Sequence, residues 1–421
     1  MQKLIILFLL FFVAAFPQSS LVNSSHLDKL YEDVVVNKQH IGIIHIYANA
    51  PDYNWVDASG EGVACIDDAA RAAVFYMRDY KAAGNKKYLS TIRNLINFQI
   101  YMHAPNGFFY NFIWKDYTID STYKTSVAEP NWWSWRALWA LAEAEKFYQN
   151  KDKAFAGVIK KHLDIGIDAL NNWLNKENNM VSYGGYNLPD WLPFETGADQ
   201  SAVIVKALSV YYGLHKSEKV RAIIEHLCSG IIKMQQGDER HIPYGAFLSW
   251  QNSWHAWGNS QSDALIDAGR VLNKKEFINA GVKEIKSFYR WLENKGFYSG
   301  FTVIKDDNGN SIFKDTVKFS QIAYGIRPII FSCMNACEVL KDTLYLNIAM
   351  KGISWFFKDN PCKALMYDPA SGIGFDGINS YEEVNRNSGA ESTIESLLSI
   401  SRLESNVKAK KQLFDLYKST K

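Results

Sequence analysis

The chain has 421 residues, of which 48% are hydrophobic and 21% charged, a balance typical of a globular protein and not of an intrinsically disordered chain. The formal net charge of +2, without a basic run, argues against a nucleic-acid-binding protein. Aromatic residues make up 14% of the chain, including 13 Trp and 23 Tyr, and such rings suit a carbohydrate cleft as well as a hydrophobic core.

The N-terminus has the pattern of a secretion signal. Lys3 supplies a positive charge, Leu4 to Ala15 form an unbroken apolar run, and small residues follow at Ser19 and Ser20. The run is too short to span a bilayer comfortably. We therefore expect residues 1–20 to be a signal peptide. Residues 21–421 should then form a single catalytic-type domain, secreted or periplasmic, without further contact with the membrane.

Hydrophobic periodicity predicts a row of helices after the signal peptide. The predicted ranges are 27–39, 66–83, 86–103, 130–149, 152–175, 197–214, 217–236, 258–272, 274–295, 318–340, 342–358, 389–404 and 406–419. Short polar turns join the members of a pair, whereas long loops over 104–129, 176–196, 237–257, 296–317 and 359–388 separate the pairs. Strand patterns are few, and Ile43–Ala48 and Tyr298–Ile304 are the clearest.

This alternation predicts an all-α fold, an (α/α)6 toroid of about six helical hairpins with the long loops at one rim. An irregular α-solenoid is the main alternative, although the sequence has no fixed repeat period. Of the five cysteines, Cys333 and Cys337 lie one helical turn apart and are interpreted as packed thiols. Neither a CxxC pair nor a histidine cluster indicates zinc, so we expect no metal and no other cofactor.

Paired carboxylates stand at the start of the helix predicted over 66–83. Adjacent carboxylates such as Asp67 and Asp68, among small and apolar residues, are costly to bury unless they have partners. One of them could cap the helix and the other could pair with Arg71. Since one cap is enough, we interpret both aspartates as candidate catalytic residues.

Glu391 lies at the start of the helix predicted over 389–404, after a loop of small polar residues. The helix dipole favours a carboxylate in a first turn, so a structural role explains Glu391 as well as a functional one does. Glycoside hydrolysis requires two carboxyl groups, one protonated and one ionised, on either side of the scissile bond. Asp67 or Asp68 together with Glu391 supplies such a pair, whereas Glu395 is interpreted as structural.

Other helix starts combine acids with aromatic side chains, which suits a sugar-binding rim. A core position explains Trp139 better than sugar stacking does, and a lone histidine is more often structural than catalytic. The candidate substrate-binding residues at these junctions are Glu129, Trp132, Trp133, Glu195, Asp199, Trp254, His255 and Trp257.

These junctions resemble those of the six-hairpin glycosidase superfamily of (α/α)6 enzymes, and within it they are most similar to glycoside hydrolase family 9. The resemblance rests on the early Asp67-Asp68 pair, the late Glu391, and Asp359-Asn360-Pro361 followed by Tyr367-Asp368. It implies an early aspartate base and a late glutamate acid, and it adds Asp368 as a candidate substrate-binding residue. The histidine-arginine motif of family 9 is not evident. The strings around Asp67 and Glu391 also resemble uncharacterised (α/α)6 domains found beside carbohydrate-active enzymes, so cellulase activity is not implied.

The leading hypothesis is a glycoside hydrolase that acts on a poly- or oligosaccharide with inversion of configuration. A polysaccharide lyase on a similar toroid would use residues such as Tyr183, Tyr186, His241, Tyr244 or His255, but the near-neutral charge does not favour it. A non-catalytic glycan-binding protein fits the aromatic residues equally well, and only the paired acids speak against it. A sugar epimerase or isomerase usually has a histidine pair, and the nine histidines show no matching arrangement.

Overall fold

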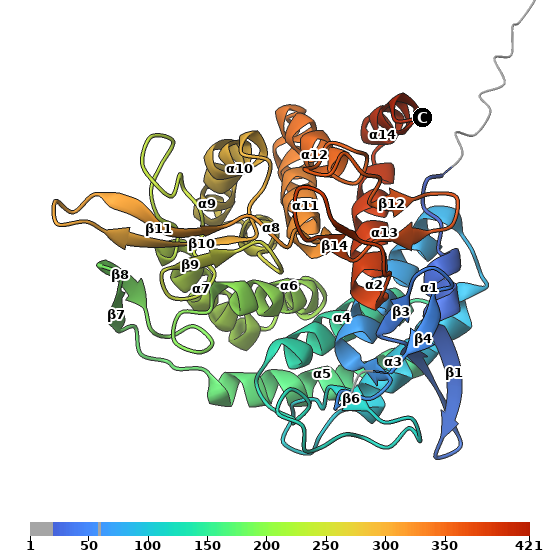
Figure 1. The fold of residues 1–421 in the computed structure, drawn as a ribbon. Coiled ribbons are helices and arrows are strands. Elements are labelled where there is room, and N and C mark those ends of the chain that lie inside the picture. Colours follow the sequence, from blue (N-terminus) through green and yellow to red (C-terminus); the bar gives the residue numbers. More distant parts are fainter. Residues whose placement is uncertain (1–19, 58–59) are drawn as a thin grey trace, which may run out of the picture.

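Helices form hairpins along the chain in this computed structural model, which describes residues 20–57 and 60–421 (Figure 1). The first helices of the hairpins are α2 (Ile66–Ala83), α4 (Trp132–Tyr148), α6 (Ala198–His215), α8 (Gln261–Leu272), α11 (Ala323–Leu340) and α13 (Ala390–Glu404). The second helices are α3 (Tyr88–Tyr101), α5 (Lys153–Trp173), α7 (Glu218–Lys233), α9 (Lys275–Glu284), α12 (Leu344–Ser354) and α14 (Val407–Ser419). Helix α9 continues through a π-helical turn, η1 (Ile285–Tyr289), into α10 (Arg290–Asn294).

The first helices pack against one another in a closed cycle. Helix α2 contacts α4, and the contacts continue through α6, α8, α11 and α13, which packs back against α2. The second helix of each hairpin packs against the first. This arrangement is consistent with the predicted (α/α)6 toroid, in which the first helices form the inner ring.

Burial along the helices agrees with an inner and an outer position. In α6 every residue from Ala198 to Ser209 is buried, so this helix is covered on all sides. In α7 the buried residues recur as Val220, Ile223, Ile224 and Leu227, which lie on one face of a helix. Hydrophobic residues of inner and outer helices join one contiguous core cluster.

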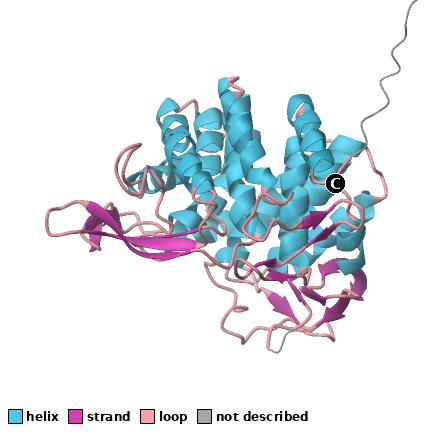
Figure 2. Cartoon of the chain, turned by 45° about the horizontal axis from the view of Figure 1, so that its top comes forward, coloured by secondary structure: helices cyan, strands magenta, loops and turns pink. Residues whose placement is uncertain are grey.

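All inner helices run in the same direction, because each outer helix returns the chain to the same end. The long loops therefore lead into the N-terminal ends of the inner helices. Figure 2 shows the strands and long loops gathered at one end of the helices. We call this end the loop rim, and the opposite end, where the inner helices terminate, the closed end.

Short antiparallel strands are present in the described residues, which corrects the prediction of an all-α fold. The paired strands are β1 (Tyr31–Val36) with β2 (Gln39–Ile44), β3 (Tyr47–Asn49) with β4 (Asn54–Val56), β5 (Ala64–Cys65) with β6 (Phe112–Ile113), β7 (Met180–Tyr183) with β8 (Tyr186–Pro189), β12 (Tyr367–Asp368) with β13 (Ile373–Gly374), and β14 (Gly377–Ile378) with β15 (Val384–Asn385). A further sheet has the order β11 (Ser311–Val317), β10 (Gly300–Lys305), β9 (Ser253–His255). The predicted strand Tyr298–Ile304 largely coincides with β10, whereas Ile43–Ala48 spans the end of β2 and the start of β3.

The predicted helix over 27–39 is wrong. A short helix, α1 (Ser25–Leu30), gives way to β1, whose Val34, Val35 and Val36 favour a strand. Asn37 and Lys38 then adopt positive φ values of 49° and 66°, as a tight hairpin turn into β2 requires. The predicted start at 318 is also early, since Gln321 pairs with Ile378 before α11 begins at Ala323.

All five cysteines lie in the described part of the chain and carry free thiols. The predicted signal peptide falls almost wholly on residues 1–19, outside the described residues. No helix in the described ranges is long and apolar enough to cross a membrane.

Candidate active site

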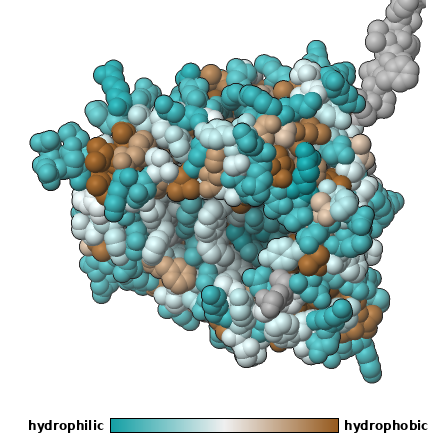
Figure 3. Space-filling model, in the orientation of Figure 1, coloured by the Kyte–Doolittle hydropathy of each residue, from teal (hydrophilic) through white to brown (hydrophobic). Residues whose placement is uncertain are grey.

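An acidic pocket opens at the loop rim where α2 and α13 begin. Its volume is about 340 Å³. Five carboxylates and one arginine supply its charged lining: Glu61, Asp67, Asp68, Asp376, Glu391 and Arg71. Figure 3 shows the molecule in the orientation of Figure 1, with a hollow near the centre of this face amid mainly hydrophilic residues. The three predicted catalytic residues thus line one pocket.

Local sequence places Asp67 and Asp68 in the first turn of α2, but neither aspartate is the N-cap. That position belongs to Cys65, an extended residue whose sulfur accepts a hydrogen bond from the Asp68 backbone N–H. Glu391 occupies the first turn of α13 in the same way, after the extended Gly389. The positive ends of both helix dipoles therefore face the carboxylates and favour their ionised forms.

Arg71 connects three carboxylates at the centre of the site. It is buried and donates from Nη2 to Asp68 over 2.6 Å, and from Nη1 to both Glu391 and Glu395 over 3.1 Å. Glu395 is fully buried and also pairs with Arg327, which agrees with its predicted structural role. In contrast, the Glu391 side chain is 44% exposed, so Glu391 can contact a ligand while Glu395 holds the arginines.

The two adjacent aspartates have different pKa values. Burial raises the pKa of Asp68 to about 6, although Arg71 opposes the shift, and the negative charge of Asp67 reinforces it. Burial acts on Asp67 in the same direction, but the attraction of Arg136 and Arg71 holds its pKa below the ordinary value. Asp68 can therefore carry a proton up to about pH 6 while Asp67 stays ionised, and such a division is typical of catalytic acid and base pairs.

Asp376 and Glu61 are pocket carboxylates that the sequence analysis did not select. Asp376 accepts hydrogen bonds from the Gly389 N–H at 2.9 Å and from the Ser392 hydroxyl at 2.6 Å, and burial raises its pKa. Glu61 accepts from the Tyr47 hydroxyl at 3.1 Å. Both lie in loops without hydrophobic periodicity, so their only local signal was an acid next to glycine, as in Gly60-Glu61-Gly62.

A second group of predicted residues is linked to the acidic pocket through Arg136 of α4. Arg136 pairs with Asp67 and donates to the Tyr324 hydroxyl over 2.7 Å. Its guanidinium lies 4.9 Å from the ring centroid of Trp132, and this ring lies 5.3 Å from that of Trp257. The structure thus brings Trp132 and Trp257 together on one side of the aspartate pair.

Contacts continue from Trp257 to a histidine and an aspartate. The His255 ring stacks on Trp257 with centroids 3.9 Å apart, and His255 Nε2 lies 2.9 Å from Asp199 Oδ2. Trp257 is 39% exposed and Asp199 is buried. These residues can offer a flat ring and a hydrogen-bonding imidazole to a sugar.

The structure corrects two of the predicted sugar-stacking residues. Trp133 is buried, and its indole N–H donates to the carbonyl oxygen of Phe109 over 2.8 Å. Trp254 is 3% exposed and stacks on Phe301 with centroids 5.1 Å apart. Both rings pack in the core, so neither has a face free for a sugar.

Like Asp199, three further predicted acids lie outside the lining of the acidic pocket. Glu129 accepts a hydrogen bond from Asn131, the N-cap residue of α4. Glu195 is exposed and accepts from the Tyr183 hydroxyl over 2.6 Å. Asp368 accepts from Ala370 N–H and the Ser371 hydroxyl, so it stabilises the turn between β12 and β13. Among the described residues, no group of three or more His, Cys, Asp or Glu could hold a metal ion.

No family model matches the sequence, and no curated protein matches it either. Solved structures do match. A sugar epimerase from a ruminal bacterium is 12% identical, covers 92% of this chain and 97% of its own, and gives a TM-score of 0.58. A D-mannose isomerase is 11% identical; the match covers 91% of this chain and 96% of the isomerase, with a TM-score of 0.60. A family 127 glycoside hydrolase, a β-arabinofuranosidase, is 12% identical; the match covers 80% of this chain and 51% of the hydrolase, with a TM-score of 0.50.

At such low sequence identities, a structural match establishes a likeness of fold and not of activity. The three structures are (α/α)6 enzymes of the six-hairpin glycosidase superfamily. The narrower likeness to glycoside hydrolase family 9 stays a prediction. The chain has the fold that these structures share, as the resemblance of its helix junctions predicted.

Proposed function

We propose that the protein is a secreted glycoside hydrolase that cleaves a poly- or oligosaccharide at the acidic pocket of an (α/α)6 toroid. The main observation that supports a hydrolase is that Asp68 and Glu391 contact the two terminal nitrogens of one buried arginine, Arg71. A hydrolase needs one carboxyl that keeps its proton and one that is ionised. The raised pKa of Asp68, about 6, supplies the first requirement.

The geometry favours Asp68 as the proton donor. Burial of its carboxyl at the pocket wall raises the pKa of Asp68 against the attraction of Arg71, whereas the Glu391 side chain is 44% exposed and can orient and deprotonate a water molecule. This assignment reverses the roles that the family 9 resemblance implies. The anomeric configuration of the first product, measured by NMR, distinguishes the predicted inversion from retention.

The charge of the pocket supports hydrolysis over lyase chemistry. Lyases act on uronic acid polymers, which five carboxylates around one arginine would repel. Two of the lyase candidates also lie elsewhere in the structure. Tyr183 bonds to Glu195, and the exposed His241 pairs with Asp238 at 2.8 Å.

A sugar epimerase or isomerase is the second candidate function. The observation that favours it is the pair His255 and Asp199, next to Trp257, which is 39% exposed. Because His255 Nδ1 also lies 2.8 Å from the Trp257 carbonyl oxygen, one of its two contacts must open before the imidazole can exchange a proton with a sugar carbon. This chemistry would change the configuration or the carbonyl position of a sugar without releasing a smaller product.

Product analysis with matched variants tests both functions. We would incubate the purified protein with a panel of plant, bacterial and host glycans and separate products by anion-exchange chromatography. Saturated oligosaccharides from wild type and Asp368→Asn, but not from Asp68→Asn, would support the hydrolase. Isomerised sugars that disappear in His255→Asn would support the second candidate instead. Glycan binding without any product would contradict both and leave a binding protein.

A further inference from the structure

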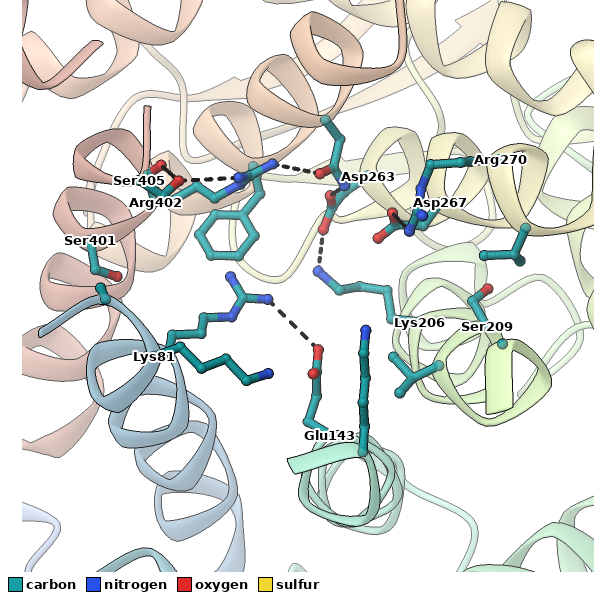
Figure 4. A pocket seen from close by; sticks show the side chains of 18 of the residues that line it. Lys81, Glu143, Lys206, Ser209, Asp263, Asp267, Arg270, Ser401, Arg402 and Ser405 are labelled. Atoms are coloured by element: carbon teal, nitrogen blue, oxygen red, sulfur yellow. Dashed lines mark hydrogen bonds and ion pairs between the residues drawn. The ribbon is translucent and has the colours of Figure 1, made fainter. Parts of the chain in front are cut away.

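A second and larger cavity lies at the closed end of the inner helices. Its volume is about 710 Å³, and all six inner helices contribute to its wall. It shares no lining residue with the acidic pocket at the loop rim. Figure 4 shows side chains from several helices converging on its open centre. A cavity of this size can enclose a small metabolite.

Positive charge predominates in this closed-end cavity. The lining cations are Arg78, Lys81, Lys146, Lys206, Arg270 and Arg402, and the lining acids are Glu143, Asp263, Asp267 and Glu404. Six cations against four carboxylates leave an excess of two positive charges. The cavity therefore has the opposite charge to the acidic pocket.

Most of these cations already have a carboxylate partner. Lys206 pairs with Asp263, Arg270 lies 3.3 Å from Asp267, and Arg402 lies 2.6 Å from Glu338. Arg78 is held more loosely, since its nearest carboxylate oxygen, on Glu143, is 3.9 Å away.

Lys81 and Lys146 differ from the other cations. Within residues 20–57 and 60–421, neither lysine has a carboxylate within 4.0 Å. Figure 4 shows the Lys81 side chain extending towards Glu143 and the open centre. Partial burial lowers the pKa of Lys81, against the attraction of Glu143, and the repulsion of Lys146 and Arg78 lowers it further. We call Lys81 and Lys146 the lysine pair.

An uncharged polar group in the wall is also without a partner. Ser209 is 4% exposed, and its hydroxyl oxygen forms no hydrogen bond to any described residue. A buried hydroxyl without a partner is costly, so its presence in a cavity wall indicates a group that it can bond. Ser401, Ser405 and Asn335 add further donors and acceptors to the wall.

Cations at helix C-termini have a structural explanation, because they stabilise the negative ends of the helix dipoles. That explanation accounts for the sign of the charge. It does not require a cavity between the side chains, nor a buried hydroxyl that lacks a partner. An anion bound among the cations would relieve their mutual repulsion, and ligand hydroxyls would satisfy the polar wall.

We propose that the closed-end cavity binds a small hydroxylated anion, such as a sugar phosphate or a sugar acid. The lysine pair and Arg78 bind the oxyanion, and Ser209 bonds a hydroxyl of the ligand. This site is distinct from the acidic pocket and does not depend on the reaction catalysed there.

Isothermal titration calorimetry at constant ionic strength tests the proposal, with glucose 6-phosphate and glucuronate as probes and glucose and inorganic phosphate as references. We expect one site per chain for at least one of the two probes, with at least tenfold weaker binding of both references. The preferred probe identifies the oxyanion. Equal binding of inorganic phosphate and glucose 6-phosphate would overturn the assignment of a hydroxylated ligand.

Variants locate the site. Lys81→Ala/Lys146→Ala should weaken binding at least tenfold, while Lys124→Ala/Lys314→Ala removes the same charge from exposed positions outside the cavity and should leave binding unchanged. Glu391→Gln should also bind normally. Circular dichroism checks that each variant is folded. Ser209→Ala tests the proposed contact with a ligand hydroxyl without changing the charge of the cavity. Absence of heat with both probes, or undiminished binding by the Lys81→Ala/Lys146→Ala variant, would overturn the proposal.

Discussion

The two ends of the inner helices carry opposite charges. At the loop rim, Asp67, Asp68 and Glu391 occupy first turns, whereas Arg78 and Lys81 lie in the later turns of α2 at the closed end. Helix dipoles favour this distribution at both ends. The sign of the charge at a helix end is therefore weak evidence of function by itself.

The ends differ in how their charges are held. Arg71 is buried and contacts three carboxylates, whereas Arg78, two turns later on the same helix, has a side chain that is 30% exposed and one carboxylate 3.9 Å away. Burial of a charge network costs free energy and perturbs pKa values. A buried network therefore fixes Arg71 and its carboxylates at the loop rim, whereas Arg78 at the closed end keeps freedom to move; Lys206, buried with Asp263, is fixed there as well.

Replacement of Arg71 and of Arg78, one at a time, should give the largest difference between the two ends. Arg71→Ala leaves buried carboxylates without their cation and should lower the free energy of unfolding by about 3–5 kcal/mol. Arg78→Ala breaks a long, partly exposed contact and should lower it by about 1 kcal/mol or less. Urea unfolding monitored by circular dichroism measures both. Similar losses from the two variants would mean that the ends do not differ in this way.

Substitution of a single carboxylate at the loop rim should affect activity more than stability. Asp68→Asn keeps the shape of the side chain but cannot release a proton, so kcat should fall about 10²–10⁴-fold on a glycan that the wild type cleaves. Asp368→Asn changes the same group in a turn outside the pocket and should keep activity within about twofold of wild type. A rate above one tenth of wild type for Asp68→Asn would remove this residue from the mechanism.

The helices could be predicted from the sequence because hydrophobic periodicity is local. The range 66–83 coincides with α2, and 389–404 differs from α13 by one residue. The prediction over 27–39 was wrong because Val34–Val36 and the turn at Asn37-Lys38 are strand and hairpin signals that a short apolar pattern conceals. Two-residue strands such as β5 leave no periodic trace at all.

The site was predicted in part, for physical reasons. Acids at helix starts were recognisable, but Arg71 meets Glu391 across 320 positions of sequence, which no local pattern encodes. Neighbouring residues on a helix point about 100° apart, so sequence could not decide that Trp132 faces Trp257 while Trp133 enters the core. Charges of the closed-end cavity resemble an ordinary solvated helix end, and only the fold reveals that they surround a cavity.

The pH dependence of stability tests the buried carboxylate of the loop rim directly. The pKa of Asp68 in the folded protein is about 6, above its ordinary value of 3.8. Between these pH values the folded state binds more protons than the unfolded state, so stability should fall as pH rises from about 4 to 6 and then level off. A shift of about two pKa units corresponds to about 3 kcal/mol. Asp68→Asn removes this contribution. The difference in the free energy of unfolding between wild type and Asp68→Asn should therefore change between about pH 4 and pH 6. Parallel curves would contradict the raised pKa.

The smallest expected effect concerns two tryptophans that lie three positions apart, Trp254 in β9 and Trp257 in the segment between β9 and α8. Trp257 is 39% exposed and Trp254 is 3% exposed. If Trp257 stacks on a sugar, Trp257→Ala should raise KM about five- to tenfold, a loss of about 1 kcal/mol, with kcat and Tm nearly unchanged. Trp254→Ala instead removes a core ring and should lower Tm without a selective change in KM. Because each variant is expected to move a quantity that the other leaves alone, kinetics and thermal unfolding of both distinguish a sugar-binding ring from a packing ring. An unchanged KM for Trp257→Ala would place the substrate away from Trp132 and Trp257 and confine it to the carboxylates around Arg71.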